Sequence, residues 1–225
     1  MPVVRLLDLV LPPACACCGL PGPAACAACL DGLDPLPAPW CGGCGAPVPV
    51  PVPRCPACRG RIEGARQAVA YAGPAPAIVA ALKDGRRRAL AAVMAERIVA
   101  AVEPPPAEAV LVPVPLGPRR LRRRGFNQSL LIARELARRW GLPVAEPLAR
   151  VREEGAQRGA GATARARQVA GAFALAEGRP VPGRPWLVDD VHTTGATLAD
   201  CARALRSGGA RRVGAVCFAR ALRGW

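Results

Sequence analysis

Two adjacent acidic residues, Asp189 and Asp190, end an apolar run that begins at Trp186, and a turn rich in threonine and glycine follows them. A helix is expected after this turn, so its first backbone N–H groups and the positive end of its dipole would face a ligand. Such a strand–turn–helix suits a phosphate group, and threonine hydroxyls add donors. The two carboxylates would accept hydrogen bonds from ribose hydroxyls, or help to hold Mg²⁺ directly or through water.

The alternative for this stretch is an ordinary strand–turn–helix capped by threonine. A P-loop is excluded, because the G-x-x-x-x-G-K-[ST] spacing is absent. His192, the only histidine of the chain, lies between the acids and the threonines. We expect it to be an incidental residue of the turn rather than a catalytic acid or base.

A second candidate site follows the apolar run at 110–114. Pro113 and Pro115 are expected to end the strand there, because proline cannot donate to a sheet ladder. A loop with five arginines follows, and Asn127 is the expected cap of the next helix. Guanidinium groups suit bidentate contact with a pyrophosphate, although a solvated basic loop is the alternative. The five arginines are Arg119, Arg120, Arg122, Arg123 and Arg124.

Cysteine spacing predicts metal in the first 60 residues. Eight of the 11 cysteines form four Cys-x-x-Cys pairs, and two such pairs make one tetrahedral zinc site. Eight ligands therefore predict two structural Zn²⁺ ions, with consecutive and interleaved pairings both open. Disulfides or redox pairs are the alternatives, and Cys201 and Cys217 are expected to be core residues. The predicted ligands are Cys15, Cys18, Cys26, Cys29, Cys41, Cys44, Cys55 and Cys58.

The elements that must position these residues alternate between strands and helices. Strands are predicted at 68–73, 110–114, 186–191 and 213–218, with a short strand near 144–148; helices are predicted at 78–83, 89–102, 128–140 and 195–206. This alternation predicts an α/β fold with a doubly wound, mostly parallel sheet, which binds ligands at the carboxyl ends of its strands. We divide the chain into a cysteine-rich zinc-ribbon module at 1–65 and an α/β domain at 66–225.

Composition limits the partners. Lys and Arg total 31 against 16 acidic residues, a net charge of +15, which favours polyanions such as phosphorylated molecules or nucleic acid. A general bias toward Ala, Arg, Gly and Pro is the alternative explanation. No apolar stretch reaches the roughly 18–20 residues that span a bilayer, and residues 1–13 do not form a signal peptide. A cytoplasmic location is therefore expected, where thiols stay reduced.

The combination of VPVPL, RGFNQ, VDDVHTTGAT and the cysteine pairs resembles the ComF family, proteins of natural transformation with a type I phosphoribosyltransferase-like fold. The resemblance implies binding of phosphoribosyl pyrophosphate with Mg²⁺. It implies catalytic roles for Asp189 and Asp190 at the ribose and for Arg165, which would come from a mobile loop. Here Gln168 replaces an asparagine that family members usually carry three residues after this arginine. The remaining implied contacts are Thr193, Thr194, Gly195, Ala196 and Thr197 for the 5′-phosphate, and Arg123 and Arg124 for the pyrophosphate.

Two functions remain open from sequence. The first is a phosphoribosyltransferase with an unknown acceptor, which the complete acid and threonine–glycine motif favours. The second is a non-catalytic binder of single-stranded DNA, which the lack of a readable acceptor pocket favours. The expected partners are accordingly a phosphoribosyl pyrophosphate-type ligand, single-stranded DNA and the DNA-uptake machinery. A pure metal-scaffold adaptor would leave both candidate loops unexplained.

Overall fold

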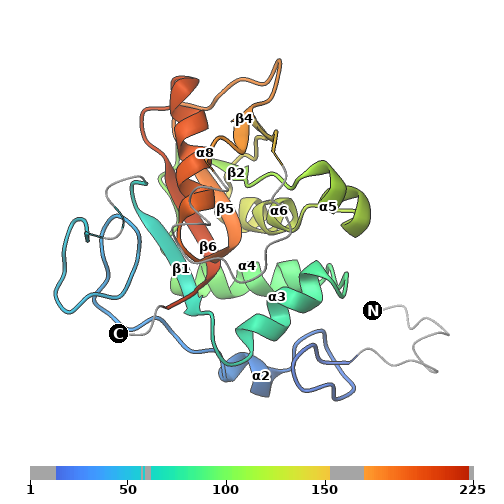
Figure 1. Ribbon diagram of the computed structural model, residues 1–225. Coiled ribbons are helices and arrows are strands. Elements are labelled where there is room, and N and C mark those ends of the chain that lie inside the picture. The colour runs from blue at the N-terminus through green and yellow to red at the C-terminus, as the bar shows by residue number, and fades with distance from the viewer. Residues whose placement is uncertain (1–13, 57, 59–61, 153–169, 223–225) are drawn as a thin grey trace.

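A parallel sheet of four strands forms the centre of the molecule (Figure 1). The computed structural model describes residues 14–56, 58, 62–152 and 170–222. The strand order is β1-β6-β5-β2, and all three pairings are parallel, as the sequence predicted. A separate antiparallel pair joins β3 to β4. The strands are β1 (Ala65–Ala70), β2 (Val110–Pro113), β3 (Leu148–Arg150), β4 (Phe173–Leu175), β5 (Pro185–His192) and β6 (Gly214–Arg220).

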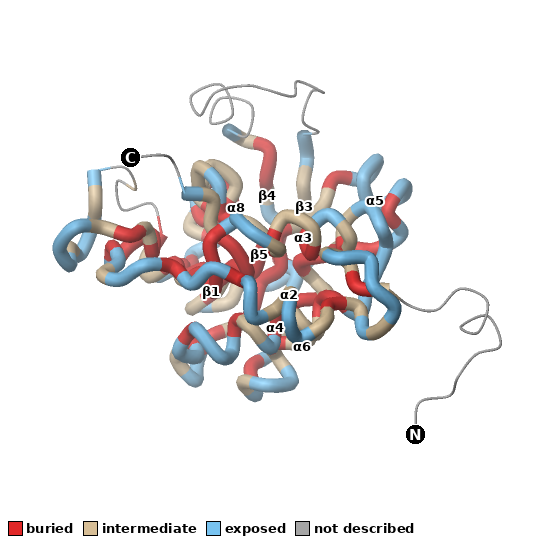
Figure 2. The backbone as a smooth tube through the Cα atoms, turned by 90° about the horizontal axis from the view of Figure 1, so that it is seen from below, coloured by how far each residue is buried: buried red, intermediate tan, exposed pale blue. Residues whose placement is uncertain are grey.

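Helices cover both faces of the sheet. Helices α4 and α6 pack on one face, and α8 packs on the other together with β3 and β4. Successive residues of β5 show the two faces: Val188 belongs to the core cluster under α4 and α6, whereas Leu187 belongs to the cluster under α8. Figure 2 shows buried backbone gathered along β1 and β5. The helices are α2 (Ala27–Asp31), α3 (Ala75–Lys83), α4 (Leu90–Ala101), α5 (Pro118–Arg124), α6 (Gln128–Trp140) and α8 (Ala196–Ser207).

Strand β5 covers the strand predicted at 186–191 and extends one residue further at each end, and its pairing with β6 joins His192 to Arg220. Two local features differ from the sequence prediction. The arginine-rich segment is the helix α5 rather than a loop, with Pro118 in its first turn and Gly125 ending it at a φ of 79°. The short strand expected near 144–148 is divided between a single bridge of Val144 to β2 and the start of β3.

The two cysteine-rich segments lie at different places on the α/β domain (Figure 1). The first lies against the start of α3, where the Cys17 thiol contacts the Pro74 carbonyl at 3.8 Å. The second lies along the edge strand β1, where the Ala65 amide donates to the Gly43 carbonyl at 2.8 Å. Each segment therefore makes its own contact with the domain. Within the described ranges, no helix is long and apolar enough to cross a membrane.

Candidate metal and ligand sites

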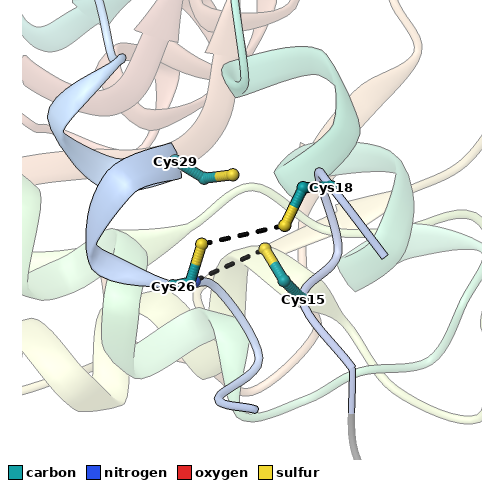
Figure 3. Close-up of side chains that lie close together, drawn as sticks. All are labelled: Cys15, Cys18, Cys26 and Cys29. Carbon is teal, nitrogen blue, oxygen red and sulfur yellow. Dashed lines mark hydrogen bonds between the residues drawn. The ribbon is translucent and has the colours of Figure 1, made fainter. Parts of the chain in front are cut away.

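The first cysteine cluster brings four thiols together from two consecutive pairs (Figure 3). The sulfurs of Cys15, Cys18, Cys26 and Cys29 all lie within 4.8 Å of one another. Cys15 accepts hydrogen bonds from the amides of Cys17 and Cys26, each at 3.4 Å. Backbone N–H groups, chiefly those of Cys18 and Cys26, lower the pKa of Cys15 to about 5. The cluster therefore favours the thiolate form that binds metal.

The second cluster repeats this arrangement with Cys41, Cys44, Cys55 and Cys58. Burial raises the pKa of Cys41, but backbone N–H groups, first that of Cys44, outweigh it and lower the pKa to about 6. The Cys41–Cys58 and Cys44–Cys55 sulfurs are 3.8 and 3.7 Å apart. A tetrahedron of thiolates with Zn–S bonds of about 2.3 Å has edges of about 3.8 Å, whereas a disulfide bond is about 2.05 Å long. Both clusters therefore fit zinc, and the consecutive pairing is the one adopted.

The acid pair of β5 is buried where three elements meet. Asp190 is 3% exposed and forms an ion pair with Lys83, the last residue of α3. Asp189 accepts a hydrogen bond from the Ser129 hydroxyl of α6 at 3.0 Å. Burial, together with the neighbouring Asp190 charge, raises the pKa of Asp189 to about 8. The site therefore holds one ion-paired carboxylate and one carboxyl that is easily protonated near neutral pH.

The predicted phosphate-binding turn directly follows this strand. Gly195 adopts a φ of 75° and caps α8, and the Ala196 amide donates to the Thr194 hydroxyl at 3.3 Å. As in any helix, the first turn of α8 leaves N–H groups without acceptors inside the helix. Thr193 is exposed, and Thr194 and Thr197 are partly exposed. The turn thus presents hydroxyls and helix N–H groups at the carboxyl end of a central strand, the usual ligand position in such sheets.

The two arginines predicted for the pyrophosphate have different environments. Arg123 is exposed on α5. Arg124 is 9% exposed, donates to Gln128 and lies 3.8 Å from Asp84. Its charge acts on Lys83, and burial lowers the pKa of its guanidinium group. Arg124 thus belongs to the charge network around the acid pair, whereas Arg165 and Gln168 lie outside the described residues.

Sequence comparison identifies the family. The chain is 35% identical to DNA utilization protein YhgH of Salmonella typhi over 193 residues, which cover 81% of this chain and 84% of that protein. The chain belongs to the ComF family. It is also 35% identical to the Shigella flexneri YhgH over 163 residues, 68% of this chain and 70% of that protein. Competence protein F of Haemophilus influenzae is 38% identical over 114 residues, covering 49% and 50% of the two chains. No protein-family model matches the sequence.

In this ComF-family chain, His192 is the last residue of β5 rather than part of the turn where it was expected. It is 4% exposed, and burial, together with the Arg220 charge, lowers its pKa to about 3. Its neutral ring lies 3.1 Å from Gln67 and 3.2 Å from Arg220 through Nδ1. Both neighbours also donate to the Cys44 carbonyl, at 3.3 and 2.7 Å. This polar chain joins the second cysteine cluster to the strand that carries the acids.

The sequence analysis also gave no site role to Lys83 and Ser129, which contact the acid pair. Lys83 is the only lysine of the chain, and that rarity was the available signal. Ser129 opens α6 beside Asn127, whose side chain accepts from the Ser129 amide at 3.0 Å and donates to the Val114 carbonyl at 3.0 Å. This confirms the predicted Asn127 cap. The cap also fixes the start of α6 against the end of β2, which places Ser129 at the acid pair.

Proposed function

We propose that this ComF-family chain has a type I phosphoribosyltransferase-like fold and binds a phosphoribosyl pyrophosphate-type ligand. The observation that carries this proposal is the direct continuity of a buried acid pair with a threonine–glycine turn at the start of α8. Acids and turn lie at the carboxyl end of a parallel strand, where α/β sheets bind phosphorylated ligands. The net charge of +15 favours such an anion.

Each group then has a role that follows from its chemistry. The 5′-phosphate would bind the turn 193–197 through hydroxyls and helix N–H groups. Asp189 and Asp190 would accept hydrogen bonds from the two ribose hydroxyls, with Lys83 as the ion-pair partner of Asp190. Arg123 would contact the pyrophosphate directly, and Arg124, whose charge interacts with Asp190, would contribute positive charge to the same site. Arg165 remains a proposed catalytic contact from the segment after β3.

Magnesium would be carried mainly by the ligand. Among the residues that the structure describes, the groups of three or more metal-binding side chains are the two cysteine clusters, so no carboxylate cage for Mg²⁺ is present there. Mg²⁺ is commonly bound through substrate phosphates and only one or two carboxylates. Its chemistry in this site would be to neutralise charge on the leaving pyrophosphate. The protein's own contribution would be to bind and orient the sugar and to exclude water.

We further propose that this activity serves the use or uptake of DNA, in the cytoplasm, where zinc-binding thiols stay reduced. The support is the relatives' names, DNA utilization protein and competence protein F. Catalysis is the more specific part of this proposal: a phosphoribosyl group would be transferred to an acceptor.

Calorimetric titration of the zinc-loaded chain with phosphoribosyl pyrophosphate and Mg²⁺ tests the ligand site. The test variant is Asp189→Asn/Asp190→Asn, and the matched control is Asp31→Asn/Glu103→Gln, which removes two exposed acids elsewhere. We expect binding by the wild type and the control, and a loss of at least about tenfold in the test variant. Equal binding by all three proteins, or none by any, would refute the ligand site.

A second function, binding of single-stranded DNA, has its own support in the exposed arginines of α5. Arg119, Arg120, Arg122 and Arg123 are all exposed on this short helix. Binding through such a surface falls steeply with salt, because phosphate contacts release counterions. Replacing Arg122 and Arg123 by glutamine should reduce both the affinity for an oligonucleotide and the slope of log affinity against log salt. An unchanged slope would exclude α5 as the DNA contact.

A further inference from the structure

The short helix α5 lies at one side of the molecule, away from the centre of the sheet (Figure 1). It has seven residues, of which Arg124 is buried and residues 118–123 are exposed. Among the described helices and strands, none packs extensively against it. A helix this short gains little stability from its own hydrogen bonds, and most helices depend on a packed apolar face. The position of α5 must therefore depend on individual polar contacts.

Two such contacts come from the loop between α3 and α4. The Arg86 guanidinium group donates through Nη2 to the Arg123 carbonyl at 2.6 Å, and Asp84 lies 3.8 Å from Arg124. The Arg123 carbonyl belongs to the last turn of α5, where carbonyl groups lack acceptable donors inside the helix. A cation at this end of a helix is also favoured by the helix dipole. Arg86 thus caps the C-terminal end of α5 from a different part of the chain.

The backbone of Arg86 is strained. Its φ is 53°, and within the described ranges it is the one residue other than glycine in the left-handed region, which is unfavourable for a residue with a Cβ. The glycine directly before it, Gly85, is not left-handed, and a Cβ there would lie 2.8 Å from the Ala81 carbonyl oxygen. Such strain persists where surrounding contacts hold it, and it is common at functional sites. The contact with Arg123 is one that holds it here.

We propose that Arg86 is a positioning residue, which holds the last turn of α5 so that Arg123 and Arg124 keep their places beside the acid pair. The inference rests on the proposed function, because it takes Arg123 as the contact for the pyrophosphate. The loop that carries Arg86 begins directly after Lys83, the partner of Asp190, so one short segment contacts both the acid pair and α5. A ligand with a pyrophosphate should therefore depend on Arg86, and a ligand without one should not.

Calorimetric titration of the zinc-loaded full chain with phosphoribosyl pyrophosphate and with ribose 5-phosphate, both with Mg²⁺, tests this role. Arg86→Gly removes the guanidinium group and relieves the left-handed strain in one step. We expect it to bind phosphoribosyl pyrophosphate about tenfold more weakly than wild type, while the affinity for ribose 5-phosphate stays within about twofold. The midpoint of urea denaturation should not fall, because glycine adopts this conformation without strain. A lower midpoint with equal loss of both ligands would overturn the positioning role.

The matched control is Arg87→Gly, which removes the same charge one position further along the loop. The Arg87 guanidinium group donates to the Ala14 carbonyl in the first cysteine-rich segment, so this variant should keep the wild-type preference between the two ligands. Equal loss of preference in both variants would mean that charge alone acts, and the inference would fail. A wild-type preference in Arg86→Gly would overturn the inference while the proposed function stands. If the wild type binds neither ligand, the proposed function fails and the inference fails with it.

Hydrogen exchange of the α5 amides tests the structural half of the inference without any ligand. The amides of Leu121 and Gly125 donate to the carbonyls of Gly117 and Leu121, at 2.9 and 2.7 Å, and so report on the opening of this helix. We expect both amides to exchange about tenfold faster in Arg86→Gly and at the wild-type rate in Arg87→Gly. Unchanged exchange in Arg86→Gly would show that its contact does not hold α5, and the inference would be refuted.

Discussion

At the residue scale, the ion pair of Lys83 with Asp190 should matter more for stability than an ordinary surface pair. Asp190 is 3% exposed, so removing Lys83 leaves a buried carboxylate without its cation. We expect Lys83→Met to lower the free energy of unfolding by about 2 kcal/mol, below the buried-pair range because the Lys83 side chain is 28% exposed. Adding Asp190→Asn should restore part of that loss, measured by urea denaturation of the zinc-loaded protein. A double variant less stable than either single variant would contradict the pairing.

The neighbouring carboxyl group of Asp189 should make the free energy of unfolding depend on pH. Burial raises its pKa to about 8, above the ordinary value of 3.8, so the folded state binds the extra proton between these pH values. The free energy of unfolding should therefore fall as pH rises from about 4 to 8, by at most about 1.4 kcal/mol per pH unit. Asp189→Asn cannot titrate and should lack this component in thermal unfolding measured across the range. Parallel pH profiles for the two proteins would argue that Asp189 is ionised throughout.

At the element scale, the turn before α8 depends on one glycine. Gly195 has a φ of 75°, and a Cβ there would lie 2.8 Å from His192 Nε2, a ring that is buried and held at Nδ1. Gly195→Ala should cost about 2 kcal/mol and weaken phosphate binding, because left-handed strain and a steric clash act together. Gly141→Ala is the matched control: φ is 67° but nothing lies within 4 Å of its Cβ, so about 1 kcal/mol is expected. Urea denaturation and phosphate titration measure both, and equal losses would exclude the clash.

Elements were predictable where a local pattern determined them. The apolar stripe of α6 and the asparagine before it predicted both the helix and its cap, and the structure confirms them. The strand predicted at 186–191 likewise agrees with β5, which extends one residue further at each end. The helix α5 was missed because its arginines carry no apolar period, although Pro118 and Gly125 stand where a helix begins and ends.

At the scale of the whole molecule, contacts between segments that are far apart in the chain could not be predicted from the sequence. Lys83 and Asp190 form an ion pair although they lie far apart in the sequence, and no periodicity relates them. The same holds for the Arg220 and Cys44 pair, separated by 176 positions. The cysteine pairs could be predicted because metal binding requires a local spacing, but that spacing did not indicate which cluster would lie next to the turn 193–197. Tertiary packing determines that placement.

The two clusters should therefore differ in their effect on ligand binding. We expect Cys15→Ser/Cys18→Ser and Cys55→Ser/Cys58→Ser each to reduce bound zinc from two ions to one per chain, measured by elemental analysis. Only the second variant should weaken phosphoribosyl pyrophosphate binding, by roughly tenfold, because the Cys44 carbonyl accepts from Arg220 at 2.7 Å and Arg220 contacts His192 at 3.2 Å. The first cluster contacts α3 near Pro74 instead, so its loss should affect mainly stability. Equal weakening by both variants would mean that zinc acts through global folding, and the polar chain from Cys44 to His192 would not couple metal to ligand.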